Sequence, residues 1–115
     1  MPIHRLKKLF AGPSPGLSRQ EAMKVFQRDR FKCQYCGLDG LNHFANWLVL
    51  TVDHIHPHAH GGARKMDNLV TACRPCNIMK GTRVFASLEE AKKYVLARRH
   101  EWQQKYHEDI KAPAS

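Results

Sequence analysis

The sequence lacks a long apolar run, and we expect no secretion signal. No stretch approaches the roughly 20 apolar residues that a helix needs to cross a bilayer. Residues 1–10 mix Arg5, Lys7 and Lys8 with apolar side chains and have no extended apolar core, which argues against a signal peptide. We therefore expect no membrane segment and a cytoplasmic protein, in which thiols stay reduced.

Acidic residues are also scarce. The chain has 10 Asp and Glu against 19 Lys and Arg, a formal net charge of +9, and 8 His that add positive charge at acidic pH. This excess favours a polyanionic partner, because cationic side chains gain affinity by releasing counterions from phosphates. Charge alone leaves open a basic surface that only keeps the protein soluble. A length of 115 residues indicates one domain with a modest core.

Cysteine occurs only in two pairs, Cys33-x-x-Cys36 and Cys73-x-x-Cys76. Two intervening residues let both sulfurs of a pair reach one ion, and Zn²⁺ prefers four ligands in a tetrahedron. Two disulfides or a redox motif are the alternatives, but a reducing compartment and the use of every cysteine favour metal. We predict one structural Zn²⁺ with no open position for water.

Local signals divide the chain into two parts. Residues 1–17 are expected to be a basic arm that ends in a linker rich in Gly and Pro, and residues 18–115 a single domain. Ser18 and Glu21 form a capping-box pattern, which predicts a helix that ends near residues 28–30. A second capping box at Ser87 and Glu90 predicts a long C-terminal helix over about 88–109.

The intervening segments favour short strands and loops. Residues 31–37 are expected to be a short strand that enters the first cysteine knuckle, where Gly37 suits a positive φ. Trp47–Val52 and Leu69–Thr71 are rich in aromatic or β-branched residues and favour strands. A short helix closed by Gly81 should follow the second knuckle. On the C-terminal helix, an apolar stripe predicts core packing. It consists of Leu88, Ala91, Val95, Trp102 and Tyr106.

Short motifs lie between and around the cysteine pairs. In order, they are Asp53-His54, Pro57, Gly61-Gly62, Asn68-Leu69 and Cys73-x-x-Cys76-Asn77-x-x-Lys80-Gly81. This order matches DH-x-x-P-x-x-x-G-G, then N-L, then C-x-x-C-N-x-x-K-G. Over about residues 31–81 the chain therefore resembles the HNH endonuclease family.

The resemblance implies an α+β fold with a small ββα-metal core of treble-clef type, stapled by zinc and flanked by N- and C-terminal helices. It implies that His54 is the general base and that Asp53 and Asn77 hold one catalytic Mg²⁺ or Mn²⁺. It also implies that Asn68 braces the loop and keeps His54 in place. Asn77 stands where the family name has its last histidine, as in HNN variants, which favours Mg²⁺ or Mn²⁺ over softer metals.

The residue types support these roles. A histidine near its ordinary pKa can accept a proton from water at neutral pH, and hard divalent cations prefer oxygen ligands. Because Asp53 and His54 are consecutive, a regular strand would point them to opposite sides. We therefore expect the strand to bend so that both reach one phosphate.

Other polar residues have two open interpretations. His56, His58 and His60 are either further contacts to metal or phosphate or solvated loop residues. Basic side chains that flank the motifs either contact the DNA backbone or are only solvated. They are Arg64, Lys65, Arg74, Lys80 and Arg83.

Three functions remain in competition. The first is a metal-dependent HNH endonuclease that hydrolyses DNA phosphodiester bonds. The second is a non-catalytic, zinc-stabilised nucleic-acid-binding module, which would have no need of Asp53, His54 and Asn77 together. The third is an adaptor that uses its long C-terminal helix to bind a protein. DNA sequence specificity, nicking or double-strand cleavage, and a monomeric or dimeric state stay open at this point.

Overall fold

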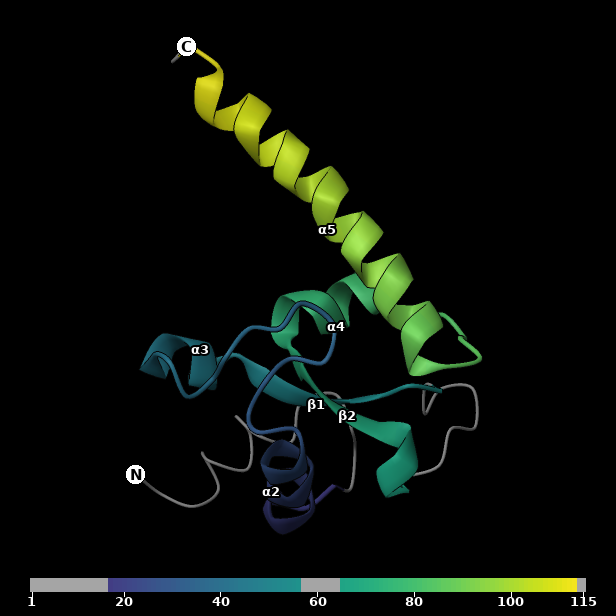
Figure 1. Ribbon diagram of the computed structural model, residues 1–115. Helices are drawn as coiled ribbons and strands as arrows, with labels where there is room; N and C mark the ends of the chain where they lie inside the picture. The colour runs from purple at the N-terminus through teal and green to yellow at the C-terminus, as the bar shows by residue number, and fades with distance from the viewer. Residues whose placement is uncertain (1–16, 57–64, 114–115) are drawn as a thin grey trace.

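The computed structural model describes residues 17–56 and 65–113. Helices surround one small antiparallel sheet (Figure 1). In chain order the elements are α2 (Arg19–Arg28), α3 (Phe44–Leu48), β1 (Leu50–His54), the 3₁₀ turn η2 (Met66–Asn68), β2 (Leu69–Cys73), α4 (Arg74–Lys80) and α5 (Leu88–Lys111). The predicted α+β class and the flanking helices are confirmed, and β1, β2 and α4 make up a ββα unit.

The two strands pair from Leu50 opposite Cys73 to His54 opposite Leu69. Every residue of both strands is buried, so the hairpin separates two apolar clusters. The α2-side cluster consists of Leu17, Ala22, Val25, Phe26, Leu50, Val52 and Leu69. The cysteine-side cluster consists of Cys33, Tyr35, Val70, Ala72, Cys73, Cys76, Phe85, Ala91 and Val95.

Helix α2 begins and ends with specific contacts. Its capping box forms as the sequence predicts, because Ser18 Oγ accepts from Glu21 N and the Glu21 side chain accepts from Ser18 N. At its other end, Arg28 Nη1 donates to Met66 O at 2.7 Å. Asp29 Oδ2 accepts from Thr71 N at 2.8 Å. The polar end of α2 therefore holds β2 and the turn before it.

Two expected strands differ from the structure. Within residues 31–37, only Lys32 joins a bridge, with Asp39. Trp47 belongs to helix α3, and the strand starts at Leu50 rather than at Trp47. The reason is the length of the partner strand, because β2 turns into α4 after Cys73, and beyond the Leu50–Cys73 pair the Arg74 N–H makes one further bond, to Val49 O at 2.7 Å.

Helix α5 starts at the predicted residue and continues to Lys111, two residues beyond the expected end. Its first turns pack on α4 through Ala91 and Val95, and its C-terminal half extends away from the rest of the molecule (Figure 1). The core packing predicted for the apolar stripe is wrong over this half, because Trp102 is 49% exposed and Tyr106 is 57% exposed. The helical spacing of apolar residues continues into this half of α5, but no other part of the described structure packs against it.

A separate finding concerns membranes. Over the described residues, no helix combines the length and the apolar character that a membrane span requires.

Candidate metal and active site

The four cysteines come together at one point, although they arise from two distant segments. Their Sγ atoms all lie within 4.8 Å of one another, and Cys36 Sγ is 3.7 Å from Cys73 Sγ. A tetrahedron with zinc–sulfur bonds of ~2.3 Å has sulfur–sulfur edges of about 3.8 Å. The cluster therefore has the donor type, number and spacing of a closed zinc site.

The local backbone shapes both halves of this cluster. In the first knuckle, Gly37 has φ +80° and its N–H donates to Cys33 O at 2.9 Å. In the second, Cys73 precedes the first residue of α4 and Cys76 lies in the first turn of that helix. The glycine at position 37 meets the predicted backbone requirement of the turn, since a positive φ is strained for other residues.

The four thiols shift one another's pKa values in different directions. Hydrogen bonding from Cys36 lowers the pKa of Cys33 below its ordinary range, whereas hydrogen bonds with Cys33 raise the pKa of Cys76. Arg99 of α5 brings a positive charge to the cluster, because its Nη1 donates to Cys76 Sγ at 3.5 Å. Sequence reasoning missed this contact, since nothing local marks Arg99.

Asp53 lies on the side of β1 that faces the cysteine cluster. Tyr35 Oη donates to Asp53 Oδ2 at 2.5 Å, and Lys80 Nζ lies 3.4 Å from the same oxygen. Asp53 is 5% exposed and Lys80 is 1% exposed. Burial raises the pKa of the Asp53 carboxyl, and the Lys80 ammonium and the Tyr35 hydroxyl oppose that shift.

His54 follows Asp53 but belongs to the opposite side of the hairpin. It pairs with Leu69, a member of the α2-side cluster, whereas Asp53 pairs with Val70 of the cysteine-side cluster. The strand therefore continues through His54 and does not bend as expected. His54 is 5% exposed, and its carbonyl accepts from Lys80 Nζ at 2.7 Å. One ammonium from α4 thus contacts both residues of the Asp53-His54 pair.

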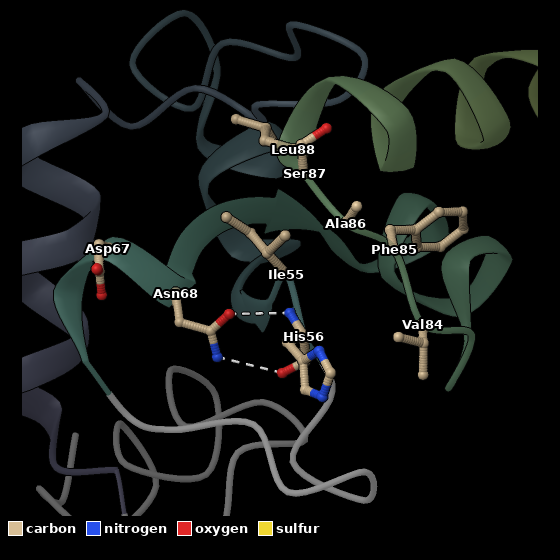
Figure 2. A pocket seen from close by; sticks show the side chains of 9 residues that line it. All are labelled: Ile55, His56, Asp67, Asn68, Val84, Phe85, Ala86, Ser87 and Leu88. Carbon is tan, nitrogen blue, oxygen red and sulfur yellow. Dashed lines mark hydrogen bonds between the residues drawn. The ribbon is translucent and has the colours of Figure 1, made fainter.

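Asn68 makes the loop-bracing contacts that the sequence suggests. Its Oδ1 accepts from His56 N at 2.9 Å, and its Nδ2 donates to His56 O at 3.2 Å (Figure 2). The Ile55 N–H also donates to Asn68 O at 2.9 Å. These bonds fix the backbone directly after His54.

Asn77 is half-buried on α4, directly after Cys76 and three residues before Lys80. Residues three apart are neighbours on a helix surface. Because Lys80 contacts Asp53, Asn77 belongs to the same part of α4. Its amide oxygen and the Asp53 carboxylate are the donor types that Mg²⁺ and Mn²⁺ prefer.

A pocket of about 570 Å³ lies beside this loop. Figure 2 shows His56 and Asn68 on one side and residues 84–88, which lead into α5, on another. His56 is half-buried at the wall of the pocket. The position suits a contact with a ligand at the mouth of the site, one of the two interpretations left open for His56.

The candidate DNA contacts divide into three groups. Lys65, Arg74 and Arg83 are exposed, and the Arg83 guanidinium lies 4.9 Å from the Tyr94 ring centroid. Lys80 is buried, so the alternative of a solvated surface lysine is wrong. The reason is the Asp53 carboxylate, which offers a buried ammonium a charged partner. The remaining candidates, His58, His60 and Arg64, lie outside the described residues.

Sequence reasoning also missed Tyr35. Its ring is 1% exposed and its hydroxyl reaches Asp53. Burial, followed by the nearby Asp53 carboxylate, raises the pKa of Tyr35, so the phenol keeps its proton and donates. The sequence offered one signal, a tyrosine between the two predicted zinc ligands Cys33 and Cys36.

Comparison with protein-family models gives a match over part of the chain. Residues 33–83 match the family model described as HNH endonuclease, and this segment contains both cysteine pairs, Asp53, His54 and Asn77. The resemblance noted in the sequence is therefore confirmed. Neither the curated proteins nor the solved structures contain a significant match.

Proposed function

Since the chain carries an HNH endonuclease domain, we propose that it hydrolyses DNA phosphodiester bonds. The observation that carries the proposal is the position of Asp53 and His54 at the end of β1, where Lys80 of the motif helix contacts both of them. We further propose that residues 18–115 form one nuclease domain and that residues 1–17 form a basic arm. The net charge of +9 supports DNA as the partner, and we propose a cytoplasmic location.

Two metal ions enter the proposal. One structural Zn²⁺ is held by Cys33, Cys36, Cys73 and Cys76, whose spacing fits a tetrahedral ion. One Mg²⁺ or Mn²⁺ is held by Asp53 and Asn77. The donor types support this second assignment, because carboxylate and amide oxygens are the ligands that these hard cations prefer. When bound, such an ion stabilises the negative charge that develops on the phosphate and the leaving oxygen.

The remaining chemistry belongs to the protein. His54 accepts the proton of the attacking water, a role suited to an imidazole near neutral pH. Asn68 acts as a positioning residue, because its two bonds to His56 hold the chain that follows His54. Exposed Lys65, Arg74 and Arg83 supply contacts to the DNA backbone.

His54 must become accessible for this chemistry. Its 5% exposure means that a phosphate can reach it only after the covering residues move. DNA binding is the proposed cause of that movement, since the free energy of binding can shift a protein toward a minor conformation.

The same burial favours a second candidate function. With His54 covered and Asp53 already paired with Lys80, the domain would serve as a zinc-stabilised module that binds nucleic acid without cutting it. The two functions differ in whether metal ions bring about hydrolysis.

Plasmid cleavage separates them. We expect the purified protein to cut supercoiled DNA with Mg²⁺ or Mn²⁺, EDTA to stop the reaction, and His54→Ala to lower the rate at least ~10²-fold. His43→Ala is the matched control, because His43 is exposed and its side chain makes no capping bond. Equal cleavage by the two variants would contradict the assignment of His54. Salt-sensitive DNA binding without cleavage in either metal would instead favour the binding module.

A further inference from the structure

We propose that Tyr35 is a positioning residue that connects the cysteine cluster to Asp53 and selects which oxygen of Asp53 binds the catalytic cation. This inference rests on the proposed function, because it assigns Asp53 to a metal. It adds a residue that lies outside the Asp53, His54 and Asn77 set.

The geometry of Asp53 carries the first step. Tyr35 Oη and Lys80 Nζ both approach Oδ2, at 2.5 Å and 3.4 Å. The hydroxyl bond has the short length typical of an O–H donor and a carboxylate. Because both groups lie at Oδ2, Oδ1 is the oxygen proposed to bind the cation. Asp53 would therefore bind its metal through one oxygen, in an orientation set before the metal arrives.

The position of Tyr35 in the chain carries the second step. It lies inside the first knuckle, between Cys33 and Cys36, and its neighbour Gln34 donates its N–H to Thr71 O of β2 at 2.9 Å. The Tyr35 ring is 1% exposed and belongs to the cysteine-side cluster. The backbone beside Tyr35 is fixed to β2 and its ring is buried, so the side chain has little conformational freedom. The structure of the knuckle therefore determines where its hydroxyl lies.

The chemistry follows from these two steps. Groups that hydrogen-bond a metal-binding carboxylate fix its orientation, and their loss typically lowers metal affinity by roughly 10- to 100-fold. Folding of the cysteine knuckle would thus prepare the second metal site as well as stabilise the domain. Lys80 contributes to the same orientation, but its charge also opposes a nearby cation, so Tyr35 gives the cleaner test.

The test measures Mn²⁺ binding without catalysis. In a His54→Ala background, free Mn²⁺ is titrated against the protein by electron paramagnetic resonance. We expect Tyr35→Phe to raise the Kd for Mn²⁺ roughly tenfold or more, with zinc content and helical circular dichroism unchanged. Tyr94→Phe is the matched control, since it removes a hydroxyl from a half-buried ring that packs at a tilt against Phe85, with the ring centroids 5.3 Å apart. It should leave the Kd unchanged.

Three results would overturn the inference or its premise. If Tyr35→Phe binds Mn²⁺ as tightly as its parent, Tyr35 does not position Asp53. If both tyrosine variants weaken binding equally, the effect is a general one on the fold. If the parent binds no Mn²⁺, the metal assignment in the proposed function fails as well, a result distinct from the first two.

A measurement without substitution covers the case in which Tyr35→Phe does not fold. The hydroxyl proton between Tyr35 and Asp53 should appear as a downfield, slowly exchanging proton resonance, and it should shift when Mg²⁺ is added to the zinc-loaded protein. A resonance that Mg²⁺ leaves in place would count against the inference.

Discussion

The two faces of the β1–β2 hairpin are built on different physical principles. On one face, the α2-side cluster consists of aliphatic side chains and Phe26, which lie against each other without a charged partner among them. On the other, the cysteine-side cluster includes four thiols, and Asp53 and Lys80 are buried on the same side. One short hairpin serves both faces because alternate residues of a strand point to opposite sides.

The α2 side therefore contributes mainly to stability, whereas most of the proposed metal ligands lie on the cysteine side. Apolar burial on the α2 side stabilises the fold at ~25 cal/mol per Å² and needs no specific partner. Each buried polar group on the cysteine side requires one, since an unpaired buried charge costs several kcal/mol. The cysteine side can therefore present ligands in fixed positions, but its stability depends on paired charges and on the proposed zinc ion. His54 is the exception, since it is the residue of the proposed chemistry on the α2 side.

Removal of zinc is expected to have the largest effect, because it acts on the cysteine side alone. We expect the purified protein to contain about one zinc ion per chain, and a strong chelator to abolish helical circular dichroism, because structural zinc contributes directly to folding. Addition of zinc should restore the signal. A protein that stays folded with four titratable thiols and no zinc would contradict the assignment of the cysteine cluster.

Phe26→Ala tests the opposite face. Phe26 is 0% exposed within the α2-side cluster, and truncation of a buried phenylalanine costs ~3–5 kcal/mol because it removes apolar contact and leaves a cavity. Urea unfolding should show that loss while zinc content stays at the parental value under native conditions. Loss of zinc in proportion to stability would mean that the two faces are not independent.

Ser18→Ala gives the smallest expected change. It removes the hydroxyl that accepts from Glu21 N at 3.0 Å at the start of α2, at a cost of about 1 kcal/mol. Thermal unfolding should detect this shift, and cleavage activity should stay at the parental level because α2 carries none of the proposed catalytic residues. Thr82→Ala is the control, because Thr82 is exposed and lies outside the helix N-caps. An equal shift in both variants would remove capping as the explanation.

Much of the fold could be predicted because its signals are local. The helix starts at Ser18 and Ser87, the turn at Gly37 and the helix end at Gly81 each depend on a few neighbouring residues. The cysteine cluster could be predicted because only four cysteines exist and they occur in pairs. The strand expected at Trp47 failed because strand length depends on a partner from a distant part of the chain.

Fewer contacts of the candidate site could be predicted from the sequence. Motif order suggested Asp53, His54 and Asn77 as candidates, and the structure adds Tyr35 and Arg99 through long-range contacts. Lys80 was identified by motif position, but its burial against Asp53 depends on how α4 packs on β1. The exposure of Trp102 likewise depends on where the domain surface ends beneath α5.

The sequence by itself predicted the main helix starts, the four candidate zinc ligands and the resemblance to the HNH endonuclease family, because capping, turn formation and metal-ligand spacing act over a few residues. Only the tertiary structure decided that Asp53 and His54 lie on opposite faces of a regular strand, that Lys80 is buried between α4 and β1, and that the end of α5 stands exposed. Burial and charge pairing depend on which distant segments cover a side chain, and the local sequence does not contain that information.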